Sequence, residues 1–221
     1  MYFVFIDIQL FKVMSANIPR KIAENVSLWS SDPAIYVVED FVSDDECDAF
    51  ISATKHELQR ATVIGLDKEQ QLEGRTNTFA WLAHDANDLI HEVSKRLSIL
   101  THFPIRNAEM FQVVHYEGDA EYKPHFDSFD IETDLGKKYW EPGGQRMITA
   151  LIYLNDVEDG GATYFPKLNI SIKPKKGNVL IFHNTIEDTV SIHPNSLHAG
   201  MPVKSGEKWA ANLWFRENLR Y

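Results

Sequence analysis

Strand-like segments that follow one another from residue 108 to the C-terminal end constrain the fold more than any other feature. Runs of β-branched and aromatic residues are separated there by turns rich in Gly, Pro and Asp, which predicts a succession of strands. The longest run, Met147-Ile-Thr-Ala-Leu-Ile-Tyr-Leu154, is apolar on both faces and therefore predicts a central strand. The expected strands are 110–116, the stretch around 125, 147–154, 162–165, 170–172, 179–182 and 208–215.

Helical patterns come before this strand-rich half. Ser43 and Glu46 have the spacing of a capping box, and an amphipathic stripe follows them over 47–58. Asp85 is expected to cap a second helix, whose apolar stripe runs over 89–100. Helices first and strands afterwards favour a mainly β structure, closed on itself and buttressed by helices. Two further strands are expected, at 34–39 and 78–82.

Clear strand and helix patterns begin near residue 35, which divides the chain into a short N-terminal segment and one domain. Residues 1–34 are expected to be an N-terminal lead-in that packs on the core in an extended form, and residues 35–221 one domain. Two polar stretches, 61–76 and 130–145, predict surface loops. Both loops are candidates for flaps that order over a bound substrate.

Charge and cysteine content exclude some partners. The formal net charge of −10 disfavours nucleic-acid binding, because a phosphate backbone would be repelled on average. The single cysteine, Cys47, allows no intramolecular disulfide and suits the reducing cytoplasm. The apolar start, residues 1–11, is interrupted by Asp7 and Gln9 and is too short to span a bilayer, so no membrane partner is expected.

The triplet His125-Phe-Asp127 is the first candidate for chemistry. In a strand, His125 and Asp127 would point to the same face. With a second imidazole they would form a three-ligand face for Fe(II), whose other coordination positions stay open. His198, in Ser196-Leu-His-Ala-Gly200, is the candidate third ligand. Spacing alone leaves the remaining histidines as competitors, including His115, His183 and His193.

An iron held in this way could bind a 2-oxo acid at two open positions and O2 at the third. The far carboxylate of such a cosubstrate needs a cation, and Lys208 at the start of the last strand is the candidate. Strand alternation puts Lys208 on the same face as Ala210, Asn212 and Trp214. Two hydroxyl groups are candidates to bind the same carboxylate, those of Tyr116 and Thr163.

Several blocks in order along the chain resemble one known family. They include Tyr122-Lys-Pro-His-Phe-Asp127, Gly160-Gly-Ala-Thr-Tyr-Phe-Pro166, Ser196-Leu-His-Ala-Gly200 and Gly206-Glu-Lys-Trp209. Together they are similar to the catalytic domain of prolyl 4-hydroxylases, which are Fe(II)- and 2-oxoglutarate-dependent dioxygenases. The likeness runs from about Ile35 to Arg216. It implies a double-stranded β-helix core (a cupin-like jelly-roll) with helices against its larger sheet.

The resemblance also implies roles for individual residues. The iron ligands fall on His125, Asp127 and His198, which favours His198 over His193, and all three are catalytic together with Lys208. Lys208 would bind 2-oxoglutarate, helped by Tyr116 and Thr163. The implied cofactors are Fe(II), 2-oxoglutarate and O2, with ascorbate as a further candidate. Peptide contacts are expected at Arg75, Glu109, Tyr122, Arg146 and Trp214.

The expected reaction couples 2-oxoglutarate decarboxylation to hydroxylation of proline in a peptide or protein partner. Two departures from the family, His115 where an arginine is common and Met201 where a cysteine is common, weaken the transfer of a substrate preference. Hydroxylation of another side chain or of a small molecule is therefore an alternative. A non-catalytic jelly-roll binding module is disfavoured, because it would need neither Asp127 nor Lys208. Halogenation is disfavoured as well, because Asp127 occupies the position a halide would need.

Overall fold

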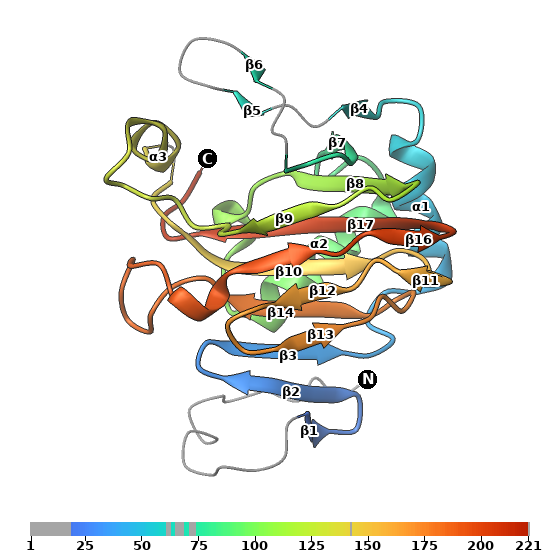
Figure 1. Cartoon of the computed structure of the whole chain (residues 1–221), viewed down its shortest axis with the longest axis horizontal. Helices are drawn as coiled ribbons and strands as arrows, with labels where there is room; N and C mark the ends of the chain where they lie inside the picture. The colour runs from blue at the N-terminus through green and yellow to red at the C-terminus, as the bar shows by residue number, and fades with distance from the viewer. Residues whose placement is uncertain (1–18, 61–62, 65–68, 71–73, 142, 221) are drawn as a thin grey trace.

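Two facing β-sheets, with helices on the outer face of the larger one, make up the protein (Figure 1). The computed structural model describes residues 19–60, 63–64, 69–70, 74–141 and 143–220. The larger sheet has nine strands in the order β1-β2-β3-β14-β10-β17-β8-β7-β4, and the smaller has four in the order β13-β12-β15-β9. This arrangement is the mainly β, jelly-roll fold expected from the sequence.

The strands of the larger sheet come from distant parts of the chain. All the neighbouring strands pair antiparallel. Its members are β1 (Arg20–Ala23), β2 (Val26–Ser31), β3 (Ala34–Val38), β4 (Gln59–Arg60), β7 (Thr78–Leu82), β8 (Phe111–Glu117), β10 (Arg146–Tyr153), β14 (Val179–His183) and β17 (Glu207–Arg216). The expected central strand is β10, which lies between β14 and β17.

Alternation along β17 divides the larger sheet into two faces. Trp209, Ala211 and Leu213 belong to the cluster that includes buried side chains of the helices. The intervening residues of β17, beginning with Lys208 and Ala210, face the other way, toward the pocket described below. The same alternation in β10 sends Ile148, Ala150 and Ile152 toward the helices and Leu151 and Tyr153 toward the smaller sheet.

The two helices that cover the outer face are α1 (Asp44–Thr54) and α2 (Asp88–Thr101). The capping box of Ser43 and Glu46 is present at α1, as expected. The expected cap of α2 at Asp85 was wrong by two residues, because the side chain of Asn87 accepts the hydrogen bond from the Ile90 N–H. None of the described helices has both the length and the apolar character needed to cross a membrane.

The smaller sheet lies in front of β10 and β14 (Figure 1). It consists of β9 (Tyr122–His125), β12 (Thr163–Phe165), β13 (Ile170–Ile172) and β15 (His198–Gly200). Phe165, Ile172, Leu180 and Phe182 are among the buried residues of the cluster that joins the two sheets. Shorter elements complete the chain: β5 (Val63–Ile64) paired with β6 (Glu69–Gln70), β11 (Asp159–Gly160) paired with β16 (Val203–Ser205), and the 3-10 turns η2 (Ile105–Asn107) and η3 (Pro194–Ser196).

Three expectations about the irregular segments need comment. The predicted loop at 130–145 contains a helix, α3 (Asp134–Trp140), which Thr133 caps through the Gly136 N–H. The described part of the predicted lead-in contains the strands β1 and β2. Because β2 pairs directly with β3, the larger sheet continues through the expected boundary between residues 34 and 35. The expected flap at 61–76 lies largely outside the described residues.

Candidate active site

Two histidines face each other on neighbouring strands of the smaller sheet. His125 ends β9 and His198 begins β15, and the two residues are direct partners in the antiparallel pairing. Each ring places its Nδ1 2.9 Å from a backbone carbonyl two residues earlier, that of Lys123 for His125 and that of Ser196 for His198. An Nδ1–H that donates to a carbonyl fixes the tautomer, so Nε2 keeps its lone pair for a metal.

Asp127 completes the group from just beyond the end of β9. Its carboxylate is buried, and Oδ2 accepts a hydrogen bond of 2.7 Å from the Thr149 hydroxyl on β10. Burial alone would raise the pKa of Asp127, but electrostatic interactions with His198, His125 and Arg146 hold it below its usual range. The carboxylate is therefore ionised at neutral pH, as a metal ligand must be.

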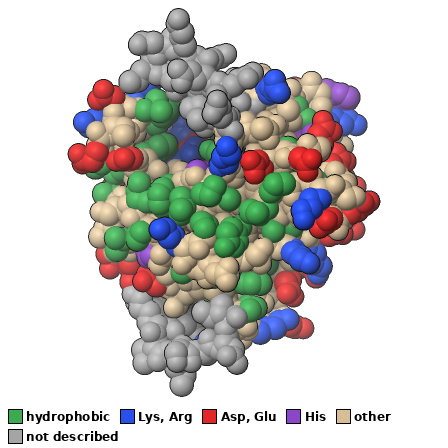
Figure 2. Space-filling model, viewed as in Figure 1, with side chains coloured by type: hydrophobic (Ala, Val, Ile, Leu, Met, Phe, Trp, Pro, Cys, Tyr) green, Lys and Arg blue, Asp and Glu red, His purple; other side chains and the backbone are tan. Residues whose placement is uncertain are grey.

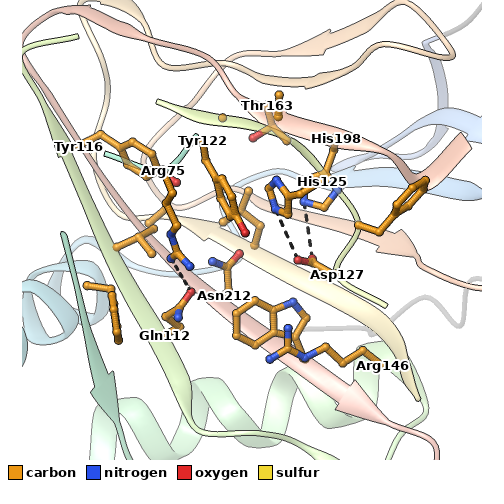
Figure 3. Close-up of a pocket in the computed structure, with 18 of the residues that line it drawn as sticks. Arg75, Gln112, Tyr116, Tyr122, His125, Asp127, Arg146, Thr163, His198 and Asn212 are labelled. Carbon is orange, nitrogen blue, oxygen red and sulfur yellow. Dashed lines mark hydrogen bonds and ion pairs between the residues drawn. The ribbon is translucent and has the colours of Figure 1, made fainter. Parts of the chain in front are cut away.

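The three side chains converge on one point (Figure 3). One ligand atom from each of His125, Asp127 and His198 lies within 4.8 Å of the other two. Burial lowers the pKa of His125, so its imidazole is neutral at physiological pH and ready to bind a cation. The competing histidines lie elsewhere: His115 contacts Glu207, His193 contacts Asp32, and His183 does not line the pocket.

A pocket of about 550 Å³ between the two sheets contains this group. Its mouth opens on the face seen in Figure 2, where a hollow near the upper edge shows basic side chains inside. Described residues of both sheets and of α3 line it: Gln59, Arg75, Phe79, Trp81, Gln112, Val114, Tyr116, Tyr122, His125, Phe126, Asp127, Phe129, Tyr139, Arg146, Leu151, Thr163, His198, Ala199, Gly200, Lys208, Ala210, Asn212 and Trp214.

Lys208 forms the charged floor of the pocket. Its side chain is 3% exposed, and Nζ donates a 2.7 Å hydrogen bond to the Gly161 carbonyl. No described carboxylate pairs with it, and burial alone lowers its pKa to about 7. Tyr116 is its direct partner across β8 and β17, and Thr163 accepts a hydrogen bond from Tyr153 beside it. A buried ammonium without a counter-ion is the signature of a site for an anionic ligand.

The mouth of the pocket carries two arginines among aromatic rings. Arg75 lies over the ring of Tyr122 at 4.6 Å and donates to the Gln112 side chain at 3.0 Å (Figure 3). Arg146 lies over the ring of Trp214 at 3.7 Å. The ring of Tyr122 also stacks on His125, with centroids 3.5 Å apart. Aromatic rings and guanidinium groups thus line the mouth, and the stacking of Tyr122 on His125 connects the mouth to the candidate metal ligands.

Comparison with known proteins gives these features a family. The model of the 2OG-Fe(II) oxygenase superfamily matches residues 111–216. A putative prolyl 4-hydroxylase of Acanthamoeba polyphaga mimivirus is 37% identical over 183 residues, with 82% of this chain and 74% of the viral protein covered. The chain belongs to the prolyl 4-hydroxylase family.

Two further relatives show how far the likeness extends. Probable prolyl 4-hydroxylase 7 of Arabidopsis thaliana is 35% identical over 209 residues, which cover 86% of this chain and 64% of the plant protein. The chain therefore spans just under two thirds of that relative. The crystal structure of the viral collagen prolyl hydroxylase of Paramecium Bursaria Chlorella virus-1, a 2OG complex, is 33% identical with a TM-score of 0.66. That match covers 82% of this chain and 95% of the other.

Among the residues expected to touch a substrate in this prolyl 4-hydroxylase family member, Glu109 is the exception. It does not line the pocket and lies behind Arg146, which donates to both of its carboxylate oxygens at 2.7 and 2.8 Å. Arg216 and Arg220 also pair with it. With its oxygens paired to three arginines, Glu109 can orient Arg146, and its expected contact with a substrate stays a prediction that the pocket lining does not support. Arg75, Tyr122, Arg146 and Trp214 do line the pocket.

Several lining residues were missing from the sequence prediction. Gln112 shares a face of β8 with Tyr116, so strand alternation was a usable signal for it, as it was for Asn212, which was expected on the face of Lys208. Trp81, on β7, is 43% exposed at the rim, 6.3 Å from the ring of Trp214. No sequence signal marked Trp81, because the pattern of its short strand does not say which face meets the pocket.

Proposed function

We propose that this chain is a peptidyl-prolyl 4-hydroxylase that uses Fe(II), 2-oxoglutarate and O2. One observation carries the proposal: the His-Asp-His group and an unpaired buried lysine lie in the same pocket. The donor set suits Fe(II), because two imidazoles and one ionised carboxylate on one side leave the other side open. The family membership of the chain supports the same cofactors.

In this proposal the floor of the pocket binds 2-oxoglutarate. Lys208 would pair with the far carboxylate, and this pairing would replace the water that the ammonium loses on burial. Burial raises the pKa of Tyr116 to about 12, so its hydroxyl stays neutral and able to donate. Thr163 accepts from Tyr153, which leaves its own proton free for the cosubstrate. The keto acid end would then reach the metal held by His125, Asp127 and His198.

When bound, the iron and 2-oxoglutarate supply the oxidising chemistry: O2 is consumed, 2-oxoglutarate becomes succinate and CO2, and the C4–H of a peptidyl proline becomes C–OH. The protein binds, orients and excludes water. The apolar side chains of Leu151, Val114 and Ala210 line the pocket beside the floor and keep it dry. Tyr122, stacked on His125, stands next to the metal position and would hold the acceptor residue against it.

The mouth of the pocket would hold the peptide. The rings of Tyr122, Trp214 and Trp81 offer flat apolar surfaces, which suit a proline ring. Arg75 and Gln112 form a polar pair that could bind backbone carbonyls of an extended chain. A proline-containing peptide or protein is therefore the proposed partner, and the charge of −10 keeps nucleic acid outside the proposal. The cytoplasm is the proposed compartment, because Cys47 is a buried free thiol.

The test measures two products in one assay. The purified protein is incubated with Fe(II), 2-oxoglutarate, ascorbate and a panel of proline-bearing peptides, and succinate and hydroxyproline are both quantified. We expect succinate and 4-hydroxyproline in equal amounts with at least one peptide. Succinate without hydroxyproline across the panel would favour the alternative, a hydroxylase of another side chain or of a small molecule. No succinate above a metal-free control under any condition would refute the proposed chemistry.

A further inference from the structure

Asn184, the first residue after β14, makes contacts that link two of the three candidate metal ligands. It is fully buried, and no part of it lines the pocket. We infer that Asn184 and Thr149 are positioning residues that set the geometry of the metal site. This inference rests on the proposed function, because it assumes that His125, Asp127 and His198 bind a divalent metal.

The side chain of Asn184 acts on Asp127 through Thr149. Its Nδ2 donates to Thr149 Oγ1 at 2.8 Å, and Thr149 Oγ1 donates to Asp127 Oδ2 at 2.7 Å. The direction of this relay is fixed, because an ionised carboxylate can only accept and an amide N–H can only donate. The hydroxyl proton of Thr149 must therefore point at Asp127. Thr149 and Asn184 are each 0% exposed, so water cannot replace either bond.

The backbone carbonyl of Asn184 acts on both ligand-bearing segments. It accepts a 3.2 Å hydrogen bond from the hydroxyl of Ser128, the residue after Asp127. It also accepts a 2.9 Å hydrogen bond from the His193 N–H. The hydroxyl of Ser196, which donates to the His193 carbonyl at 2.8 Å, lies 3.3 Å from the Asn184 carbonyl, and the carbonyl of Ser196 faces Nδ1 of His198. One residue at the end of β14 therefore contacts both the segment after β9 and the segment before β15.

The contacts of Asn184 and Thr149 connect the two sheets at the candidate metal site. His198 belongs to the smaller sheet, whereas Asp127 follows β9 and reaches over to β10 of the larger sheet. A metal site shared between two sheets would loosen with any movement of one sheet against the other. The relay through Thr149 ties the carboxylate to β10, and the carbonyl of Asn184 ties the two segments together. Such partners of metal ligands typically affect metal affinity by about 10–100-fold.

The experiment measures the apparent Kd of the protein for Mn(II), from the signal of free Mn(II) in electron paramagnetic resonance. Thr149→Val keeps the shape of the side chain and removes the donor, so we expect the Kd to rise by about tenfold or more. Thr149→Ser restores the hydroxyl and should return the Kd to within about twofold of the parent value. Asn184→Ala leaves Thr149 in place but frees its proton to turn away, and should raise the Kd as well.

Thr54→Val is the matched control. Thr54 is also fully buried, and its hydroxyl donates to the Phe50 carbonyl at 2.8 Å inside α1, away from the pocket. We expect this variant to bind Mn(II) like the parent. The double variant Thr149→Val/Asn184→Ala should bind no more weakly than Thr149→Val alone, because both changes break the same relay.

The possible outcomes separate this inference from the proposed function. A parent protein that binds no Mn(II) overturns the metal site itself. A parent that binds Mn(II), with Thr149→Val unchanged, overturns only the relay. An equal loss in Thr54→Val overturns the relay too, because the cause would then be general loosening of the fold. Should Thr149→Val fail to fold, Asn184→Ala decides in its place: an unchanged Kd refutes the relay and a raised Kd supports it.

Discussion

The floor and the mouth of the pocket differ in how they are built. The floor consists of Lys208, Tyr116 and Thr163, which are 3%, 6% and 2% exposed and lie on strands deep between the sheets. The mouth includes Trp81, which is 43% exposed on a short strand near the edge of the larger sheet. A charge without a described counter-ion dominates the floor, whereas aromatic rings in mutual contact dominate the mouth.

This difference suggests a division of work between the two ends. A deeply buried floor suits one small anion that is the same in every turnover. A mouth of partly exposed rings suits a polymer that must enter, stack and leave again. The metal group lies where the two ends meet, so each end should be separable from the other by mutation. Mutations at the floor should change 2-oxoglutarate binding alone, mutations at the mouth should change peptide binding alone, and mutations in the candidate metal group should affect both.

The largest effect is expected for the candidate metal ligands. His125→Ala and Asp127→Ala should each abolish succinate formation, with or without peptide. Each variant keeps only two of the three ligands, which are too few to hold the metal in the position where it binds 2-oxoglutarate. Succinate release and Mn(II) binding are the measurements. His115→Gln is the control: that ring stacks on Trp209 at 4.2 Å outside the pocket, so the variant should keep both properties. Succinate formation by His125→Ala at the parent rate would refute the assignment.

The next largest effect is expected at the floor. Lys208→Ala should raise the 2-oxoglutarate concentration needed for half-maximal succinate formation by about 100-fold, since losing a buried charge pair costs about 2–5 kcal/mol. Mn(II) binding should be nearly intact. Lys95→Ala, which removes an exposed lysine on α2, is the control. Equal dependence on 2-oxoglutarate in Lys208→Ala and the parent would remove the distinction between floor and mouth.

A third prediction concerns pH and the same lysine. Burial lowers the pKa of Lys208 to about 7, and only the protonated form pairs with a carboxylate. The apparent Kd for 2-oxoglutarate, measured with Mn(II) bound, should be flat below about pH 7 and rise by about tenfold per unit above it. The Kd of Lys208→Ala should not show this rise. A parent Kd that stays constant up to pH 9 would contradict the lowered pKa, and a Lys208→Ala Kd equal to that of the parent would mean that another group binds the far carboxylate.

The sequence predicted the floor better than the mouth, for physical reasons. Lys208, Tyr116 and Thr163 lie on strands whose alternation and buried pattern can be read directly from the sequence. The expected shared face of Lys208, Ala210, Asn212 and Trp214 is confirmed, because all four residues line the pocket. At the mouth, local patterns are weak and tertiary contacts decide.

Three features show what local patterns lack. The helix α3 was expected to be a loop, because seven residues rich in charge carry little apolar periodicity. Glu109 was expected to touch the substrate, but three arginines far away in sequence take up its carboxylate. The link from Asn184 to Thr149 spans 35 positions and leaves no trace in spacing. The contacts of Glu109 and of Asn184 form only when strands far apart in the sequence become neighbours in the larger sheet.

The smallest effect is expected at the rim, and it tests the mouth alone. Trp81→Ala should raise the KM for a peptide by about fivefold, because a half-exposed ring that packs on a substrate contributes about 1 kcal/mol. The KM for 2-oxoglutarate and the rate of peptide-free succinate formation should stay at parent values. Leu89→Ala is the matched control, since Leu89 is also 43% exposed but lies on α2 outside the pocket. A change in the 2-oxoglutarate KM of Trp81→Ala would show that the two ends of the pocket act as one, whereas an unchanged peptide KM would place the peptide away from β7.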